Sequence, residues 1–190
     1  MYIWSLSSMN FLFGKHGMEI YHIENNNNHG GCSRYYIAKK NVKKITKNVL
    51  THMSLEKKIG VNKLSTFLKF KNKINFLKKN LKSLLINLKD KNKIIVGYGA
   101  PAKSSTILNF CGIDNKLIDK IYDNSETKIG KYTPGKSLIK IENSDNFKKT
   151  KSDYCVLFAW NHKKEILLKE NNYSKKNGKW IIPVPKLKII

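Results

Sequence analysis

Closely spaced cysteines and histidines are absent from this sequence. Its three cysteines, Cys32, Cys111 and Cys155, lie far apart, with no CxxC pair and no neighbouring pair of histidines. Zinc sites need such spacings, and disulfide-stapled domains need many more cysteines. We therefore expect reduced thiols and no metal site.

Long apolar runs are absent too. No stretch approaches the roughly 18 apolar residues that span a bilayer. The N-terminus has no basic region followed by the continuous apolar segment of a secretory signal. These absences argue against a membrane-spanning protein, and they predict no membrane partner and a cytoplasmic location.

Arginine and acidic residues are scarce, so lysine carries the charge. The 190 residues include 37 basic and 13 acidic ones, a formal charge of +24, and Arg34 is the only arginine. Proteins that read bases use arginine for bidentate contacts and place aromatic residues among basic ones. Here lysine is spread along the whole chain with many asparagines, as an AT-rich coding sequence would produce. We infer that these lysines are solvated, and we expect no nucleic-acid partner. A basic nucleic-acid-binding protein is the least favoured of the three functions considered below.

Patterned segments divide the chain into three parts. Residues 1–40 combine a helical pattern over Leu6–Phe13 with two alternating segments, "MEIYHIE" and "SRYYIAKK", which predict a hairpin at the edge of a larger sheet. Residues 41–92 are a polar linker followed by one long amphipathic helix over Leu64–Leu88. Residues 93–190 alternate strand and helix.

The last part predicts an α/β fold. Four apolar runs, "KIIVGYG", "LIDKIYD", "DYCVLFAW" and "KWIIPVP", are separated by helical segments or turns. This alternation is typical of a parallel sheet covered on both faces. Right-handed crossovers make it a small doubly wound, Rossmann-like domain. In such a sheet ligands bind beyond the carboxyl ends of the strands, so the residues after each run are the candidate site.

The main candidate follows the first run, at residues 97–106. Its glycines allow a tight turn, its proline suits a first helical turn, and the free amides there would face an anion. The stretch fits neither GxGxxG nor a P-loop. A plain strand-to-helix turn would use the same residues, so both interpretations stay open. The candidate residues for phosphate contact are Gly97, Tyr98, Gly99, Ala100, Pro101, Lys103, Ser104, Ser105 and Thr106.

Further candidates follow the other runs. Asp123 stands where dinucleotide-binding folds place the acidic residue that binds ribose, so a standalone module for NAD or another nucleotide is the second alternative. An Asx turn would use the same residue. Asn161 follows the third run, and Lys131 and Tyr132 lie on a loop predicted to cover the same end of the sheet.

Several motifs together resemble one enzyme family. "GYGAPAKSSTILNFCGI" is similar to the loop and helix in the C-terminal domain of SAM-dependent sugar C-methyltransferases, which add a methyl carbon to a nucleotide-linked keto-sugar. The segments "YDNSETKIGKYTPGKSLIKI", "DYCVLFAWNHKKEI" and "GKWIIPVPKLKII" resemble the later parts of that domain. Near the start, "SLSSMNFLFGKHGMEIYHIE" and "HGGCSRYYIAKK" resemble the family's helix and strands, so the resemblance covers nearly all of the chain.

The resemblance implies that this chain has only part of the function of the complete enzyme. Complete members carry a zinc-binding segment, a SAM-binding domain and a Tyr-x-Glu-His stretch with catalytic side chains, and this sequence has none of them. Residues 1–40 resemble the last helix and hairpin of that methyltransferase domain. We therefore expect the chain to bind the nucleotide-linked sugar, to hold no catalytic residue and to be inactive alone. SAM would be bound in the complete enzyme, in a domain that a separate chain could carry. The resemblance adds His29, Gly30 and Gly31 to the sugar-binding residues.

Overall fold

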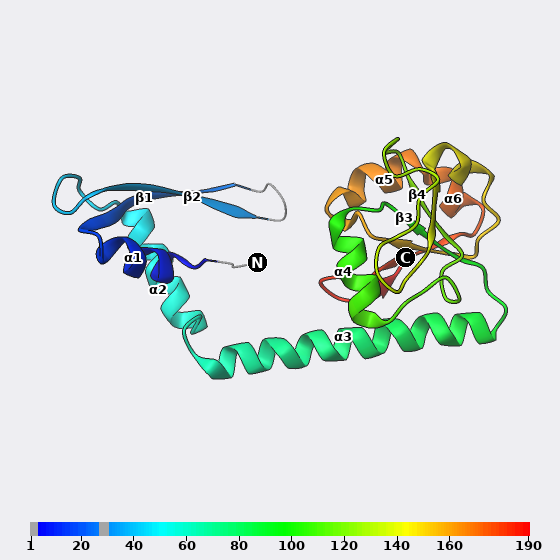
Figure 1. The fold of residues 1–190 in the computed structure, drawn as a ribbon, viewed down its shortest axis with the longest axis horizontal. Helices are drawn as coiled ribbons and strands as arrows, with labels where there is room; N and C mark the ends of the chain where they lie inside the picture. The colour runs from blue at the N-terminus through cyan, green and yellow to red at the C-terminus, as the bar shows by residue number, and fades with distance from the viewer. Residues whose placement is uncertain (1–3, 27–30) are drawn as a thin grey trace. The chain divides into compact units, whose positions relative to one another are not determined.

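The computed structural model describes residues 4–26 and 31–190. The chain forms two compact units, Met1–Asn72 and Lys73–Ile190, which we call the N-terminal and the C-terminal unit (Figure 1). The long helix α3 (Leu64–Asp90) contributes residues to both units. No helix in the described part of the chain is long and apolar enough to cross a membrane.

The N-terminal unit contains the predicted helix and hairpin. α1 (Leu6–Gly14) begins after Ser5, whose hydroxyl accepts a hydrogen bond from the Ser8 amide at 3.1 Å. β1 (Met18–Asn26) pairs antiparallel with β2 (Cys32–Lys39). Among the described residues the sheet of this unit has these two strands alone, so the larger sheet of which they would form the edge stays a prediction.

A second helix, α2 (Lys47–Ile59), was not predicted, because its apolar residues are scattered among lysines. It packs against α1 and β1 through a small core. Its Glu56 joins it to α1: the two carboxylate oxygens accept the amides of Leu6 at 2.7 Å and Ser7 at 2.8 Å. A carboxylate at a helix N-terminus stabilises the helix through its dipole and its free amides. The buried residues of the core are Leu6, Ile20, Ile23 and Val49.

The C-terminal unit is built on a six-stranded sheet in the order β5-β4-β3-β6-β7-β8. Neighbouring strands are parallel except for β8, which runs antiparallel to β7. This order is that of doubly wound, dinucleotide-binding folds, so the predicted Rossmann-like α/β fold is confirmed. The strands are β3 (Ile95–Tyr98), β4 (Lys120–Asp123), β5 (Lys140–Asn143), β6 (Tyr154–Leu157), β7 (Lys179–Ile182) and β8 (Lys188–Ile189).

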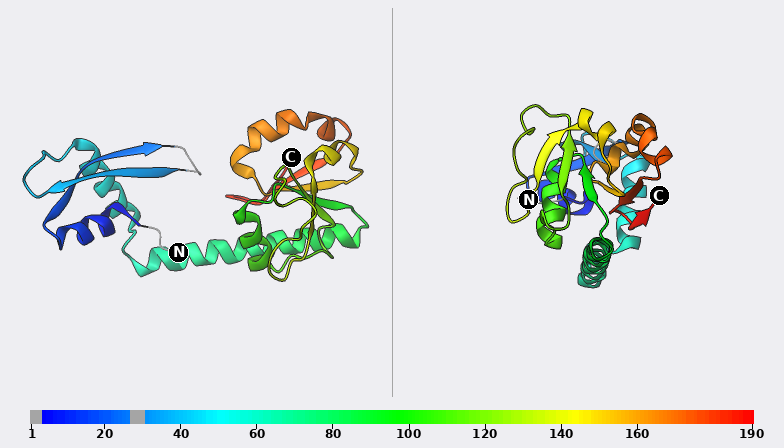
Figure 2. Two further views of the ribbon diagram at one scale, coloured as in Figure 1. Left: turned by 45° about the horizontal axis from the view of Figure 1, so that its top comes forward. Right: turned by 90° about the vertical axis from the view of Figure 1, so that its right-hand side faces the viewer.

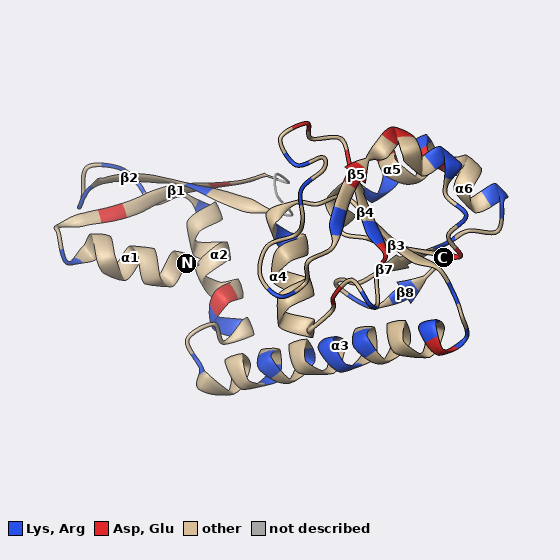
Figure 3. Ribbon diagram, turned by 45° about the vertical axis from the view of Figure 1, so that its right-hand side comes forward, with Lys and Arg blue, Asp and Glu red and all other residues tan. Residues whose placement is uncertain are grey.

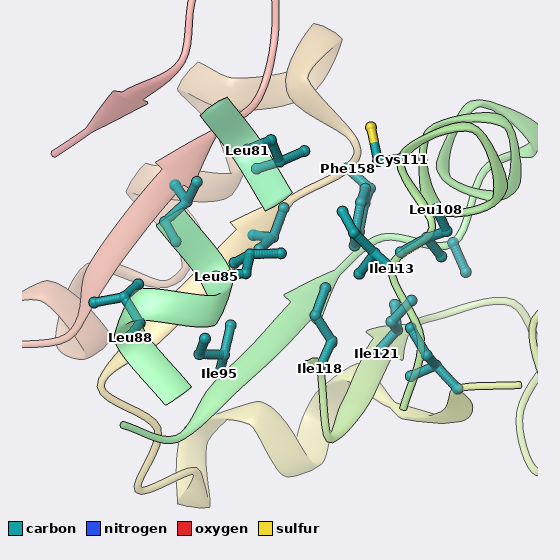
Figure 4. Close-up of a cluster of buried hydrophobic side chains, with 14 of the residues drawn as sticks. Leu81, Leu85, Leu88, Ile95, Leu108, Cys111, Ile113, Ile118, Ile121 and Phe158 are labelled. Carbon is teal, nitrogen blue, oxygen red and sulfur yellow. The ribbon is translucent and has the colours of Figure 1, made fainter. Parts of the chain in front are cut away.

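Helices cover both faces of this sheet (Figure 2). Successive residues of a strand point to opposite faces, which produces two separate cores. One face packs against α3 and α4 (Ala102–Cys111), and Figure 4 shows Leu85 and Leu88 of α3 close to the strand residue Ile95. The residues of this core include Leu81, Leu85, Leu88, Ile95, Leu108, Cys111, Ile113, Ile118, Ile121 and Phe158.

The other face packs against the short helices η2 (Ser144–Lys149), α5 (Lys163–Lys169) and α6 (Asn171–Lys175). Its centre is an aromatic cluster around Phe147, which lies fully buried. The ring centroid of Phe147 is 4.9 Å from that of Tyr98, 4.9 Å from that of Tyr173 and 5.5 Å from that of Trp180. Such ring pairs contribute about 0.5–1.5 kcal/mol each beyond the burial of their area.

Asp153 ties the start of β6 to the start of β3 and gives the unit an acid-sensitive contact. Its carboxylate accepts the Ile94 amide at 2.8 Å and the Lys93 ammonium at 2.9 Å. The Ile94 amide, followed by Lys93, lowers the pKa of Asp153 below its ordinary value. A lowered carboxyl pKa adds stability above the unfolded pKa, and this stability is lost as the pH falls through the folded pKa.

We therefore expect Asp153→Asn to destabilise the unit at pH 7 by about 0.5–1 kcal/mol, a value kept small because the side chains of Asp153 and Lys93 are 34% and 44% exposed and are screened by solvent. The difference from the unchanged protein should shrink below about pH 4, where an ordinary Asp protonates. Urea unfolding between pH 7 and pH 2.5 measures it, with Asp145→Asn as the exposed control. A difference that stays constant with pH would contradict the assignment.

Candidate functional site

The winding of the sheet reverses at one point. From β3 the chain winds outward through β4 to β5, and it then returns to form β6 on the other side of β3. Doubly wound sheets bind their ligands outside the carboxyl ends of the strands at this switch point. β3 ends at Tyr98, which pairs with Leu157 at the end of β6. We call the loops that follow these two residues, 99–101 and 158–160, the switch-point site.

Two glycines let these loops approach each other closely. Gly99 has a φ of +82°, and a Cβ built on it would lie 2.7 Å from the Cβ of Ala159. Its amide donates to the Tyr122 carbonyl at 2.7 Å, which fixes the turn against β4. A Cβ on Gly97 would lie 2.8 Å from side-chain atoms of both Ile121 and Phe158. Neither position therefore has room for a larger residue.

Asp123 holds the loop after β3 through a hydrogen bond to its backbone. Its side chain is buried, with one oxygen accepting the Ala100 amide at 2.6 Å and the other accepting the Ser125 amide at 2.8 Å. The Lys128 ammonium lies 3.8 Å from the second oxygen. Hydrogen bonds to a charged acceptor are about twice as strong as neutral ones. Sequence reasoning missed this positioning role, although an Asx turn at Asp123 was one of its two interpretations.

The entrance of α4 leaves a small set of donors for a ligand. The hydroxyl of Ser104 donates to the Pro101 carbonyl at 2.7 Å, and that of Thr106 donates to the Ala102 carbonyl at 3.3 Å, so both bond to their own helix. The amides of Ala102 and Lys103 have no hydrogen-bond partner within residues 4–26 and 31–190. The Lys103 ammonium lies 5.6 Å from the ring centroid of Trp160, within cation–π range. Lys103 and Trp160 therefore meet across the switch point.

Comparison with known proteins identifies the family of this chain. A model of the C-methyltransferase C-terminal domain matches residues 27–185. The chain belongs to this family. C-methyltransferase NovU of Streptomyces niveus is 28% identical over 187 residues, which cover 98% of this chain and 44% of NovU. The chain thus spans less than half the length of that relative, and the predicted resemblance to C-methyltransferases is confirmed.

Within this C-methyltransferase C-terminal domain, the structure brings some predicted residues together and separates others. Gly97, Gly99, Ala100, Pro101, Lys103 and Asp123 all surround the switch point, and Asn161 lies beside it in η3 (Trp160–His162). Ser105 lies in the first turns of α4, where its carbonyl accepts the side-chain amide of Asn109 at 2.8 Å.

Tyr98 lies in the second core. Its hydroxyl donates to the buried carboxylate of Glu170 at 2.8 Å. Burial, followed by this hydrogen bond, raises the pKa of Tyr98 far above its ordinary value, so the hydroxyl stays protonated. The side chain is therefore part of the packing, and a ligand at the switch point would meet the backbone of this residue.

Lys131 and Tyr132 lie away from the switch point. The Lys131 carbonyl accepts the Ile141 amide at 2.8 Å, and Tyr132 bridges to Lys140, which places both on the outer edge of β5. β4 and β5 lie between them and β3. Gly31, with a φ of +113°, precedes β2 in the N-terminal unit. His29 and Gly30 lie outside the described residues.

Asn109 is a positioning residue that the sequence analysis did not single out. Its side-chain amide donates to the Pro134 carbonyl at 2.9 Å, and its oxygen accepts the Lys136 amide at 3.0 Å. Gly135, at a φ of +83°, passes directly over this side chain. The "TPGK" turn could have indicated a tight loop, but no local pattern shows its partner on α4. In the described part of the chain, no group of three or more His, Cys, Asp or Glu side chains could hold a metal ion.

Proposed function

We propose that this chain binds the nucleotide-linked sugar of a SAM-dependent C-methyltransferase at the switch-point site. The observation that carries the proposal is the α4 entrance, where the amides of Ala102 and Lys103 have no partner among the described residues and the Lys103 ammonium lies over the Trp160 ring. A helix N-terminus with free amides attracts phosphate. The diphosphate of an activated sugar would occupy this position, and family membership supports the choice of ligand.

The hydrogen bonds of Asp123 give little support to an NAD-type contact with ribose. In NAD-binding folds the acidic residue at this strand end accepts hydrogen bonds from ribose hydroxyls. Here both carboxylate oxygens already accept backbone amides. A ribose at this strand end would therefore have to share a carboxylate that already holds the loop, whereas the free amides of α4 suit a phosphate group. The lysines occur on many elements of the described chain and are not confined to one helix or strand (Figure 3).

The chain would contribute binding and orientation to methyl transfer. In the reaction a base removes the proton beside the sugar ketone, and the resulting carbanion forms a carbon–carbon bond as the methyl–sulfur bond breaks. SAM, when bound in the complete enzyme, supplies the methyl group. The amides of Ala102 and Lys103, with the Lys103 ammonium, would hold the sugar nucleotide so that its reacting carbon faces the methyl group. Binding energy would then be used to orient the reactants.

The surface of the N-terminal unit supports a partner domain. Large apolar side chains on α1, α2 and the first turns of α3 are exposed, whereas four of the described residues form the buried core of the unit. Large exposed apolar side chains are typical of interaction surfaces. We propose that a SAM-binding domain covers these exposed side chains. That domain lies outside these 190 residues and could be carried by a separate chain. The exposed residues include Phe11, Leu50, Leu55, Ile59, Leu64, Phe67, Leu68 and Phe70.

Lys103→Gln tests the sugar-nucleotide site. We expect this variant to bind a nucleoside-diphosphate sugar roughly tenfold more weakly, because one charge-assisted hydrogen bond contributes about 1.5 kcal/mol. Isothermal titration calorimetry measures the affinity, and Lys116→Gln, which removes one exposed lysine at the opposite end of the sheet, is the matched control. Equal affinities in the two variants, or tight binding of NAD with no response to any nucleotide sugar, would contradict the proposal. Incubated with SAM and the sugar, the chain alone should form no methylated product.

A further inference from the structure

A hollow lies at the end of the sheet opposite the switch-point site. It has a volume of about 470 Å³ and lies where the chain enters β6 and β7, between residues 147–153, the helices α5 and α6, and residues 177–178. Because β3, β6 and β7 are parallel, their amino ends share one edge of the sheet and their carboxyl ends the other. The hollow is therefore separate from the switch-point site.

Positive charge dominates the lining of this hollow. Five lysines line it, and its two acidic residues are engaged by other groups. Asp153 binds the Ile94 amide and the Lys93 ammonium, and Glu170 accepts the Tyr98 hydroxyl from within the core. Lys169 approaches Glu170 at 3.8 Å, and the other four lysines form no ion pair within the described residues. The five lysines are Lys148, Lys149, Lys151, Lys169 and Lys176.

Hydroxyl groups form the floor of the hollow. Tyr173 and Ser152 are each more than nine-tenths buried, and the Ser152 hydroxyl donates to the Tyr173 oxygen at the long distance of 3.5 Å. Thr150 donates to Ser152 at 3.2 Å. Burial raises the pKa of Tyr173, so its hydroxyl keeps its proton and can donate it. Gly178 lets the Tyr173 ring lie directly against the backbone, because a Cβ there would overlap the ring.

We propose that this hollow, which we call the lysine pocket, binds a small phosphate-bearing molecule. The lysines at the rim would neutralise the phosphoryl charge, and the hydroxyl of Tyr173 would donate to a phosphoryl oxygen from the floor. A volume of about 470 Å³ suits a compact anion, since small-molecule pockets typically hold about 300–1,000 Å³. A charged surface of solvated lysines would not need buried hydroxyl groups beneath it. We therefore favour a binding site.

Inorganic pyrophosphate and amide NMR test the proposal on the full chain. At 150 mM NaCl we expect saturable shifts of the Ser152, Asn177 and Gly178 amides. The double variant Lys149→Gln/Lys176→Gln should weaken this binding about tenfold. The control Lys116→Gln/Lys136→Gln removes the same charge elsewhere and should change it less than about twofold, because distant exposed charges are screened.

The amides of Ala102 and Lys103 report binding at the switch point in the same spectra, so the sugar-nucleotide proposal and the lysine pocket can fail independently. Equal weakening in both double variants, or shifts that do not saturate, would show nonspecific attraction to a +24 chain and would overturn the proposal. The lysine pocket would equally be ruled out if pyrophosphate left the Ser152, Asn177 and Gly178 amides unmoved.

Tyr173→Phe isolates the floor from the rim charge. The variant keeps the ring and loses one hydroxyl whose hydrogen bond is long, so we expect little change in its melting temperature. Pyrophosphate should bind it about fivefold more weakly at the Ser152 and Gly178 amides, as for the loss of one hydrogen bond. Unchanged affinity would overturn the assignment of the pocket floor and, with it, the proposal.

Discussion

Gly99→Ala should destabilise the C-terminal unit by about 2–5 kcal/mol and remove sugar-nucleotide binding at the switch-point site. Two costs add. A φ of +82° is unfavourable for any residue with a Cβ, by about 1–2 kcal/mol. The new Cβ would also lie 2.7 Å from the Cβ of Ala159, and overpacking of this kind costs about 1–3 kcal/mol. Chemical denaturation measures the stability, and calorimetry measures the binding.

Gly130→Ala is the matched control for this prediction. Gly130 has nearly the same backbone conformation, with a φ of +81°, but a Cβ on it would meet nothing within 4 Å. It should therefore incur the backbone cost alone, about 1–2 kcal/mol. Adding Ala159→Gly to Gly99→Ala removes the clashing methyl group and should recover part of the lost stability. Equal losses at Gly99 and Gly130 would show that the two loops do not press against each other.

The fold could be predicted where hydrophobic pattern and local structure agree. The runs around β3, β4, β6 and β7 are apolar because both faces of these strands are buried, and each was predicted as a strand. β5 reads Lys-Ile-Glu-Asn and has one fully buried residue, Ile141, because it is the outermost strand. β8 has two residues, too few for any periodic pattern. These two strands could be found only through their neighbours in the sheet.

The position of the candidate site could be predicted from the sequence, but the hydrogen bonds of its side chains could not. The order of apolar runs placed residues 97–106 at a strand end, and the sheet order puts that end at the switch point. No local pattern shows that Asp123 accepts the Ala100 amide, because the two residues are 23 positions apart. The burial of Tyr98 likewise depends on Glu170, 72 positions away. Tertiary contacts of this range decide which side chains remain free for a ligand.

Asp123→Ala separates the two roles that this residue could have. If Asp123 holds the loop, the variant leaves the Ala100 and Ser125 amides without their acceptor, and we expect a loss of about 2–4 kcal/mol together with weaker sugar-nucleotide binding. Asp145→Ala, an exposed carboxylate in the first turn of η2, should change stability by less than about 0.5 kcal/mol. Urea unfolding measures both losses. If instead Asp123→Ala matches Asp145→Ala in stability and still loses binding, the carboxylate contacts the ligand itself, and the loop must be held by its glycines alone.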